Sequence, residues 1–170
     1  MKFYTGIGSR ETPFDVLQAM TAVANKLEEY GFILRSGGAR GADKAFENGT
    51  GNSQIFHTDG TDGIPYHAGV WSDAMDIAFN FHPAWHRCND YVKKLHTRNV
   101  FQVLGAELDD PSKFVICWTP DGAQFTGETS RETGGTGMAI RIANHFGVPV
   151  FNLADSSTTA RIERWYQLEE

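Results

Sequence analysis

The stretch FILRSGGARGADKAF, residues 32–46, joins a short apolar segment to a glycine-rich turn and then to a helical pattern. Residues 32–35 are predicted to form a strand and residues 42–47 a helix. A buried strand that passes through a tight turn into a helix is the repeating unit of a parallel sheet covered by helices. This stretch therefore predicts an α/β fold.

The same alternation continues along the chain. Apolar runs typical of strands lie at 2–7, 54–57, 114–118 and 148–153, and helical spacings lie at 13–30, 73–79, 83–104 and 138–146. Thr12 is expected to be the N-cap of the first helix, with Pro13 at its first helical position. A short helix is expected within 155–170, and 58–72 is ambiguous. We predict one domain, residues 1–170, with a doubly wound, mostly parallel, Rossmann-like sheet and helices on both faces.

The composition is that of an ordinary globular protein, with 41% hydrophobic and 21% charged residues. No apolar run is long enough to span a membrane, and the N-terminus lacks the apolar segment of a secretory signal. The two cysteines define no disulfide framework. A cytoplasmic protein without membrane association is therefore expected. The net charge of −6 disfavours broad nucleic-acid binding, because non-specific affinity comes mainly from neutralising phosphates.

Three loops follow predicted strands at the edge of the sheet where ligands bind in this fold class. They are residues 6–10 (GIGSR), 36–41 (SGGARG) and 134–137 (GGTG), and the last two lead directly into helices. Glycine allows close backbone approach, and the amides at a helix N-terminus favour an anion. Three such loops at one edge, two of them with an arginine, favour a phosphate or nucleotide ligand over simple turns.

The turn SGGARGAD, residues 36–43, resembles the signature of the Rossmann domain of DNA-processing protein A (DprA/Smf). That domain belongs to a superfamily with the LOG phosphoribohydrolases and the SLOG ligand-sensing domains. Residues 4–10 (YTGIGSR), 96–100 (HTRNV), and 134–139 (GGTGMA) with 147–150 (GVPV) also resemble family segments. The relatives that this resemblance implies are small single-domain DprA- or LOG-like proteins of phages and mobile elements.

The resemblance and the loop chemistry together imply a phosphate-binding role for one group of residues. Arg40 and Arg98 are the foremost members, and Asp43 is expected mainly to fix the loop. The full group is Gly8, Ser9, Arg10, Ser36, Gly37, Gly38, Arg40, Gly41, Asp43, Arg98, Asn99, Gly134, Gly135, Thr136 and Gly137.

The chain departs from the LOG motif PGGxGTxxE. Thr133 replaces the proline and Met138 the second threonine, and Ile140 and Arg141 stand where glutamates would fall. The catalytic carboxylate of that family therefore does not transfer. As a conjecture, the preceding loop supplies one, with Glu128 and Glu132 as the candidate catalytic residues and Asp121 as a further carboxylate.

Several other residues have two interpretations. Trp118 either stacks on a base at the ligand edge or belongs to the core, and it should face the opposite side of the sheet from Cys117. His57 and His96 are candidates for the ligand site. His82 and His86, four residues apart with Cys88 nearby, have the spacing of metal ligands but no convincing further ligand. We predict neither a metal site nor a cofactor.

Three functions are compatible with these features. The first is an enzyme that hydrolyses the N-glycosidic bond of a nucleotide. The second is a non-catalytic module that senses or sequesters a nucleotide-derived signal, which the missing LOG glutamates favour. The third, disfavoured by size and charge, is a DprA-like protein that binds single-stranded DNA. A homo-oligomer is expected, because 73–104 is rich in aromatic residues.

Overall fold

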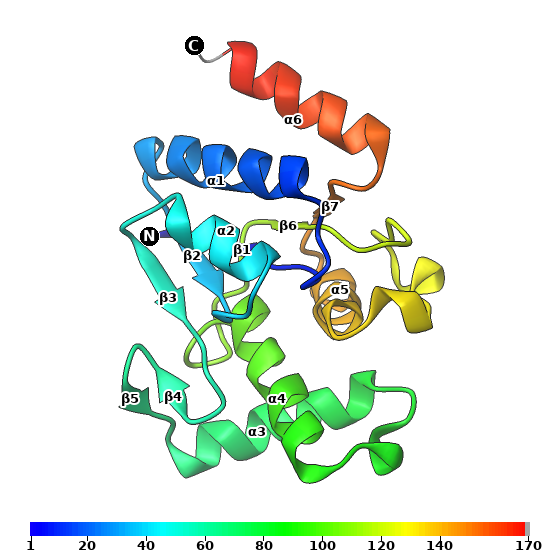
Figure 1. Ribbon diagram of the computed structural model, residues 1–170. Helices are drawn as coiled ribbons and strands as arrows, with labels where there is room; N and C mark the ends of the chain where they lie inside the picture. Colours follow the sequence, from blue (N-terminus) through cyan, green and yellow to red (C-terminus); the bar gives the residue numbers. More distant parts are fainter. Residues whose placement is uncertain (169–170) are drawn as a thin grey trace.

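The computed structural model describes residues 1–168 (Figure 1). Its strands are β1 (Lys2–Gly6), β2 (Phe32–Ser36), β3 (Ser53–Ile55), β4 (Gly60–Thr61), β5 (Ile64–Pro65), β6 (Val115–Cys117) and β7 (Val150–Asn152). Its α-helices are α1 (Phe14–Glu29), α2 (Ala42–Asn48), α3 (Ala68–Phe81), α4 (Asp90–Leu104), α5 (Thr136–His145) and α6 (Ser156–Leu168). Single 3-10 turns form η1 (Trp85–Arg87), η2 (Thr126–Glu128) and η3 (Arg131–Thr133).

The main sheet has five strands in the order β3-β2-β1-β6-β7, and every pairing is parallel. The chain moves outward from β1 to β3 and then returns to the other side of β1 with β6. The strand order therefore reverses between β1 and β6, and ligands bind at such a switch point in this class of fold. The predicted α/β class with a doubly wound parallel sheet is confirmed.

Helices cover both faces of the sheet (Figure 1). One core cluster packs α1 and α2 against Tyr4, Leu34 and Ile116, and α6 joins it through Ile162. The other packs α3, α4 and α5 against the opposite face, where Cys117 lies. Trp118 contacts the first cluster and the fully buried Cys117 belongs to the second, so their predicted opposite orientation is confirmed.

Several boundaries differ from the sequence-based predictions. Pro13 occupies the N-cap position of α1 and the helix begins at Phe14, so the predicted capping role of Thr12 is wrong. The buried Thr12 hydroxyl instead donates to the Ser9 carbonyl oxygen at 2.7 Å.

The helix expected over 83–104 is divided in two. Its first part is only the 3-10 turn η1, and α4 starts anew at Asp90, where Asn89 Oδ1 accepts a hydrogen bond from the Val92 amide at 2.9 Å. Helix α3 is longer than predicted, and the ambiguous segment before it holds the small β4–β5 hairpin. Helix α6 is also longer than predicted. No helix within residues 1–168 is long and apolar enough to cross a membrane.

A buried arginine anchors β2 to a neighbouring loop. The side chain of Arg35 is 2% exposed, and its Nη1 donates to the Asp110 carbonyl oxygen at 2.6 Å and to Ser112 Oγ at 3.1 Å. Its guanidinium also covers the Phe3 ring at 4.0 Å. Arg35 thus ties β2 to the loop between α4 and β6.

Candidate functional site

A cavity of about 440 Å³ opens at the switch point. Four segments form its wall: the loop after β1, the turn between β2 and α2, one face of α4, and the loop that leads into α5. The lining residues are Ile7, Gly8, Ser9, Arg10, Glu11, Ala39, Asp43, Val92, Leu95, His96, Arg98, Asn99, Gln102, Glu132, Thr133, Gly134, Gly135 and Thr136. The predicted glycine loops at residues 6–10 and 134–137 therefore meet in one cavity. The loop at residues 36–41 contributes Ala39, and Asp43 of α2 follows it in the wall.

The carboxylate of Asp43 organises the turn between β2 and α2. It is buried and accepts hydrogen bonds from the backbone amides of Ala39, Gly8 and Gly37. The turn therefore directs amides to its own aspartate. These contacts are those expected of a residue that fixes the loop, and Asp43 also forms part of the cavity wall.

Two different physical features distinguish the glycines at this edge of the sheet. A Cβ on Gly8 would lie 2.8 Å from the Trp118 carbonyl oxygen, and one on Gly41 would lie 2.7 Å from the Ser9 carbonyl oxygen. These glycines are required because the loops pack closely on one another. Apart from the adjoining residues of the chain, nothing lies within 4 Å of the corresponding positions on Gly134 and Gly135, so their backbone is open at the cavity.

Arg98 reaches the cavity from α4 but is already well engaged. Its Nη1 donates to the carbonyl oxygens of Gly37 at 2.9 Å and Phe56 at 3.1 Å, and its Nε donates to Asn99 Oδ1 at 3.0 Å. Burial lowers the pKa of Arg98, and the negative charge of Asp43 opposes that effect. Asn99 in turn donates from Nδ2 to the Gly135 carbonyl oxygen at 3.2 Å and thereby positions the glycine loop before α5.

The three arginines of the predicted phosphate group differ in location. Arg10 is exposed at the cavity and Arg98 lies in its wall, whereas the exposed Arg40 does not line it. Five other members of the predicted group also lie outside the wall: Ser36, Gly37, Gly38, Gly41 and Gly137.

Two serines expected to contact phosphate are engaged within the loops. The buried Ser36 hydroxyl donates to the Gly6 carbonyl oxygen at 2.6 Å, which joins β2 to β1. Ser9 lines the cavity, and its Oγ accepts a hydrogen bond from the Glu11 amide at 3.0 Å.

The two candidate catalytic glutamates lie in different surroundings. Glu128 Oε1 accepts hydrogen bonds from the amides of Gln124 at 3.1 Å and Phe125 at 3.2 Å, and the residue does not line the cavity. Glu132 lies exposed at the cavity rim, beside the open backbone of Gly134. Of the two candidate catalytic glutamates, Glu132 lines the cavity and Glu128 does not.

Asp121 holds the loop between β6 and α5 together. Its carboxylate accepts hydrogen bonds from the hydroxyls of Thr119, Ser130 and Thr133 and from the Ala123 amide. Burial by itself would raise the pKa of Asp121, but these hydrogen bonds outweigh it and hold the pKa below its ordinary value. Asp121 therefore shapes the rim that presents Glu132.

Trp118 and His57, which the sequence suggested for the ligand site, lie outside the cavity wall. Trp118 is packed against the α1–α2 side of the core, which is the second of its two predicted interpretations. His96 does line the cavity. Sequence reasoning missed Gln102, although its spacing of three and four residues from Asn99 and Arg98 on α4 is the signal that places all three on one helix face.

Comparisons of the chain with known protein families, with curated proteins and with solved structures gave no match.

A pH dependence follows from the burial of Asp43. Burial raises the pKa of Asp43 from 3.8 to about 6, against the lowering effects of Arg98 and of the three backbone amides. The folded chain therefore holds this proton more tightly than the unfolded chain. The contribution of Asp43 to the free energy of unfolding is greatest below pH ~4, declines by about 3 kcal/mol as the pH rises to ~6, and is constant above that.

A titration of the aspartate carboxyl carbons by 13C NMR checks this expectation. Comparison with the variant Asp43→Asn identifies the Asp43 signal. We expect its midpoint near pH 6. A midpoint at or below the ordinary aspartate value would contradict the prediction, because it would mean that the amides and Arg98 outweigh burial.

Proposed function

We propose that this protein binds a nucleotide or a nucleotide-derived phosphate ligand in the cavity at the switch point. The observation that carries the proposal is the convergence of Arg10, Arg98 and the N-terminus of α5 on one cavity. Arginine and the first amides of a helix both favour an anion of the size of phosphate. The resemblance of residues 36–43 to the DprA signature, and of residues 134–137 to a loop shared with LOG proteins, supports the same ligand class.

The cavity offers different surfaces to the parts of such a ligand. The open backbone of Gly134 and Gly135, at the start of α5, suits the phosphate, with the exposed Arg10 as a cation that lines the same cavity. Ile7, Val92 and Leu95 supply apolar wall for the base or sugar. A volume of about 440 Å³ lies within the range of small-molecule sites.

Arg10 and Arg40 form a matched pair for testing this proposal. Both are exposed arginines in glycine loops at the same sheet edge, but only Arg10 lines the cavity. Arg10→Ala is expected to weaken phosphate-ligand binding about tenfold or more, since a charge-assisted hydrogen bond contributes roughly 1.5–3 kcal/mol. Arg40→Ala is expected to leave the affinity unchanged.

The measurement begins with a panel of nucleoside mono-, di- and triphosphates and cyclic nucleotides. Native mass spectrometry identifies which compound the protein retains, and calorimetry then gives its affinity for the wild type and both variants. Equal affinities in the wild type and Arg10→Ala would contradict the assignment of the ligand to this cavity. A loss of affinity in Arg40→Ala alone would move the ligand to the turn between β2 and α2.

Glu132 favours a second step, the hydrolysis of the N-glycosidic bond of the bound nucleotide. A carboxylate at the rim is suited to activate water or to stabilise the developing positive charge on the ribose. If the panel yields a retained but intact nucleotide, the function is sensing or sequestering. Single-stranded DNA stays the disfavoured alternative, because the net charge is −6.

The expected homo-oligomer also stays a prediction. Phe79 and Tyr91, which are 58% and 62% exposed, lie in the aromatic-rich segment that motivated it. A sedimentation-velocity measurement of the purified chain gives its stoichiometry directly.

A further inference from the structure

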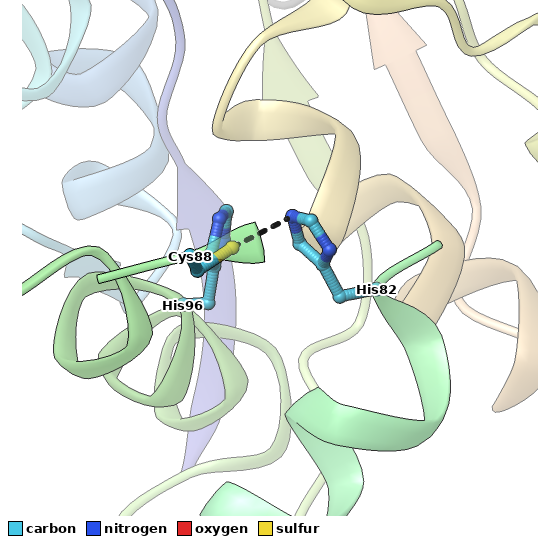
Figure 2. A group of neighbouring side chains, drawn as sticks. All are labelled: His82, Cys88 and His96. Atoms are coloured by element: carbon cyan, nitrogen blue, oxygen red, sulfur yellow. Dashed lines mark hydrogen bonds between the residues drawn. The ribbon is translucent and has the colours of Figure 1, made fainter. Parts of the chain in front are cut away.

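Three side chains with metal-ligating atoms, His82, Cys88 and His96, converge where α3 and α4 are connected (Figure 2). His82 follows the last turn of α3, Cys88 follows η1, and His96 lies on α4. Cys88 Sγ and His82 Nε2 are 3.7 Å apart, and the centroids of the two imidazole rings are 4.5 Å apart. One ligand atom from each residue lies within 4.8 Å of the others.

The connection between α3 and α4 gathers these residues. The Ala84 amide donates to His82 Nδ1 at 2.9 Å, and the Cys88 thiol lies 3.6 Å from the Ala84 carbonyl oxygen. Trp85 packs against both imidazole rings, at 6.3 Å from His82 and 6.5 Å from His96. All three side chains are half-buried; the folded turn holds His82 and Cys88, and α4 carries His96.

One ring nitrogen of the cluster has no hydrogen-bond partner. Nδ1 of His96 is a buried polar atom without a partner among the described residues. Such orphaned atoms are uncommon, and a metal ion or its bound water is one explanation.

We propose that His82, Cys88 and His96 bind a divalent metal ion of the zinc type. One thiolate and two imidazoles are the ligand types that Zn²⁺ prefers. Tetrahedral zinc, with Zn–S and Zn–N bonds of about 2.3 and 2.0–2.1 Å, places a sulfur and a nitrogen ligand roughly 3.6 Å apart. The separation of 3.7 Å between Cys88 Sγ and His82 Nε2 fits that value.

Binding requires two proton movements. The thiol of Cys88 loses its proton to solvent, and the resulting negative charge offsets the repulsion between the metal ion and Arg141. Because His82 Nδ1 accepts from the Ala84 amide, Nε2 carries the ring proton in the metal-free chain. That proton moves to Nδ1 when Nε2 binds the metal, so the Ala84 amide must turn away.

Three protein ligands leave a fourth position for water or a ligand, which is the arrangement of catalytic rather than structural zinc sites. His96 also belongs to the cavity wall, so the metal would adjoin the cavity. The metal site uses none of Arg10, Glu132 and Gly134. The phosphate-binding proposal and the metal proposal can therefore fail independently.

The test uses protein without a histidine tag, stripped with a chelator and titrated with Zn²⁺ and, separately, with Co²⁺. The wild type is expected to bind about one equivalent, and Co²⁺ should produce a thiolate charge-transfer band together with the visible bands of tetrahedral coordination. Cys88→Ser and His96→Gln are each expected to weaken binding by more than roughly 100-fold, since even outer-shell changes cost 10- to 100-fold.

His86→Gln is the matched control, because His86 is exposed in η1 and lies outside the cluster. Sequence reasoning had paired His86 with His82. Circular dichroism shows whether each variant folds. If the Cys88 and His96 variants do not fold, the cobalt spectrum of the wild type decides by itself. Stoichiometric binding that needs His86, binding unaffected by Cys88→Ser, or a wild type with no thiolate band would each overturn the proposal.

Discussion

Asp43→Ala is expected to lower the free energy of unfolding at pH 7 by about 3 kcal/mol. Three backbone amides, of Ala39, Gly8 and Gly37, would lose their acceptor in a buried position. Each buried donor left without a partner costs about 1–3 kcal/mol. Removal of a desolvated charge offsets part of this loss. The net effect still exceeds that of an ordinary surface substitution.

Urea unfolding of the wild type and the variant measures this difference. Asp43→Asn keeps one acceptor oxygen, so its free energy of unfolding is expected to lie between those of the wild type and Asp43→Ala. Asp73→Ala is the matched control, because Asp73 is an exposed aspartate in α3 and its replacement should change stability by less than about 0.5 kcal/mol. A loss in Asp43→Ala no larger than in Asp73→Ala would show that the turn does not depend on this carboxylate.

Glu132→Gln is expected to reduce N-glycosidic hydrolysis of the bound nucleotide by about 10²- to 10⁴-fold, the usual contribution of one acid–base residue. The amide keeps the shape of the side chain but can neither accept a proton nor stabilise a ribosyl cation. The affinity for the intact nucleotide should change little, since the phosphate would be held by Arg10 and the start of α5.

The experiment measures the release of free base by chromatography and the affinity by calorimetry. Glu128→Gln is the comparison, because Glu128 lies in the same loop but bonds to the amides of Gln124 and Phe125 outside the cavity. Equal rates in the wild type and Glu132→Gln, or a greater loss in Glu128→Gln, would remove Glu132 from the reaction. Retention of intact nucleotide by all three proteins would identify a binding module.

The local pattern of the sequence determined much of the fold. The apolar runs near residues 2–7, 32–35 and 114–118 became parallel strands of one sheet, because such runs suit strands buried on both faces. The period of two also placed Cys117 and Trp118 on opposite sides. The edge that holds the cavity follows from strand direction alone.

Which groups meet in the cavity was decided by tertiary packing. A glycine-rich turn has the same local sequence pattern whether its amides face a ligand or a side chain. Here the amides donate to the buried carboxylate of Asp43. The sequence favoured Arg40 over Arg10, but the folded chain brings Arg10 and not Arg40 to the cavity wall.

The His82–Cys88–His96 cluster was likewise decided by tertiary packing. His96 belongs to a separate helix and joins the other two only because α4 packs against α3. Periodicity in a sequence reports which residues share a face of one element. The contacts between elements depend on the whole core, and they determine which side chains from different elements come within bonding distance of one another.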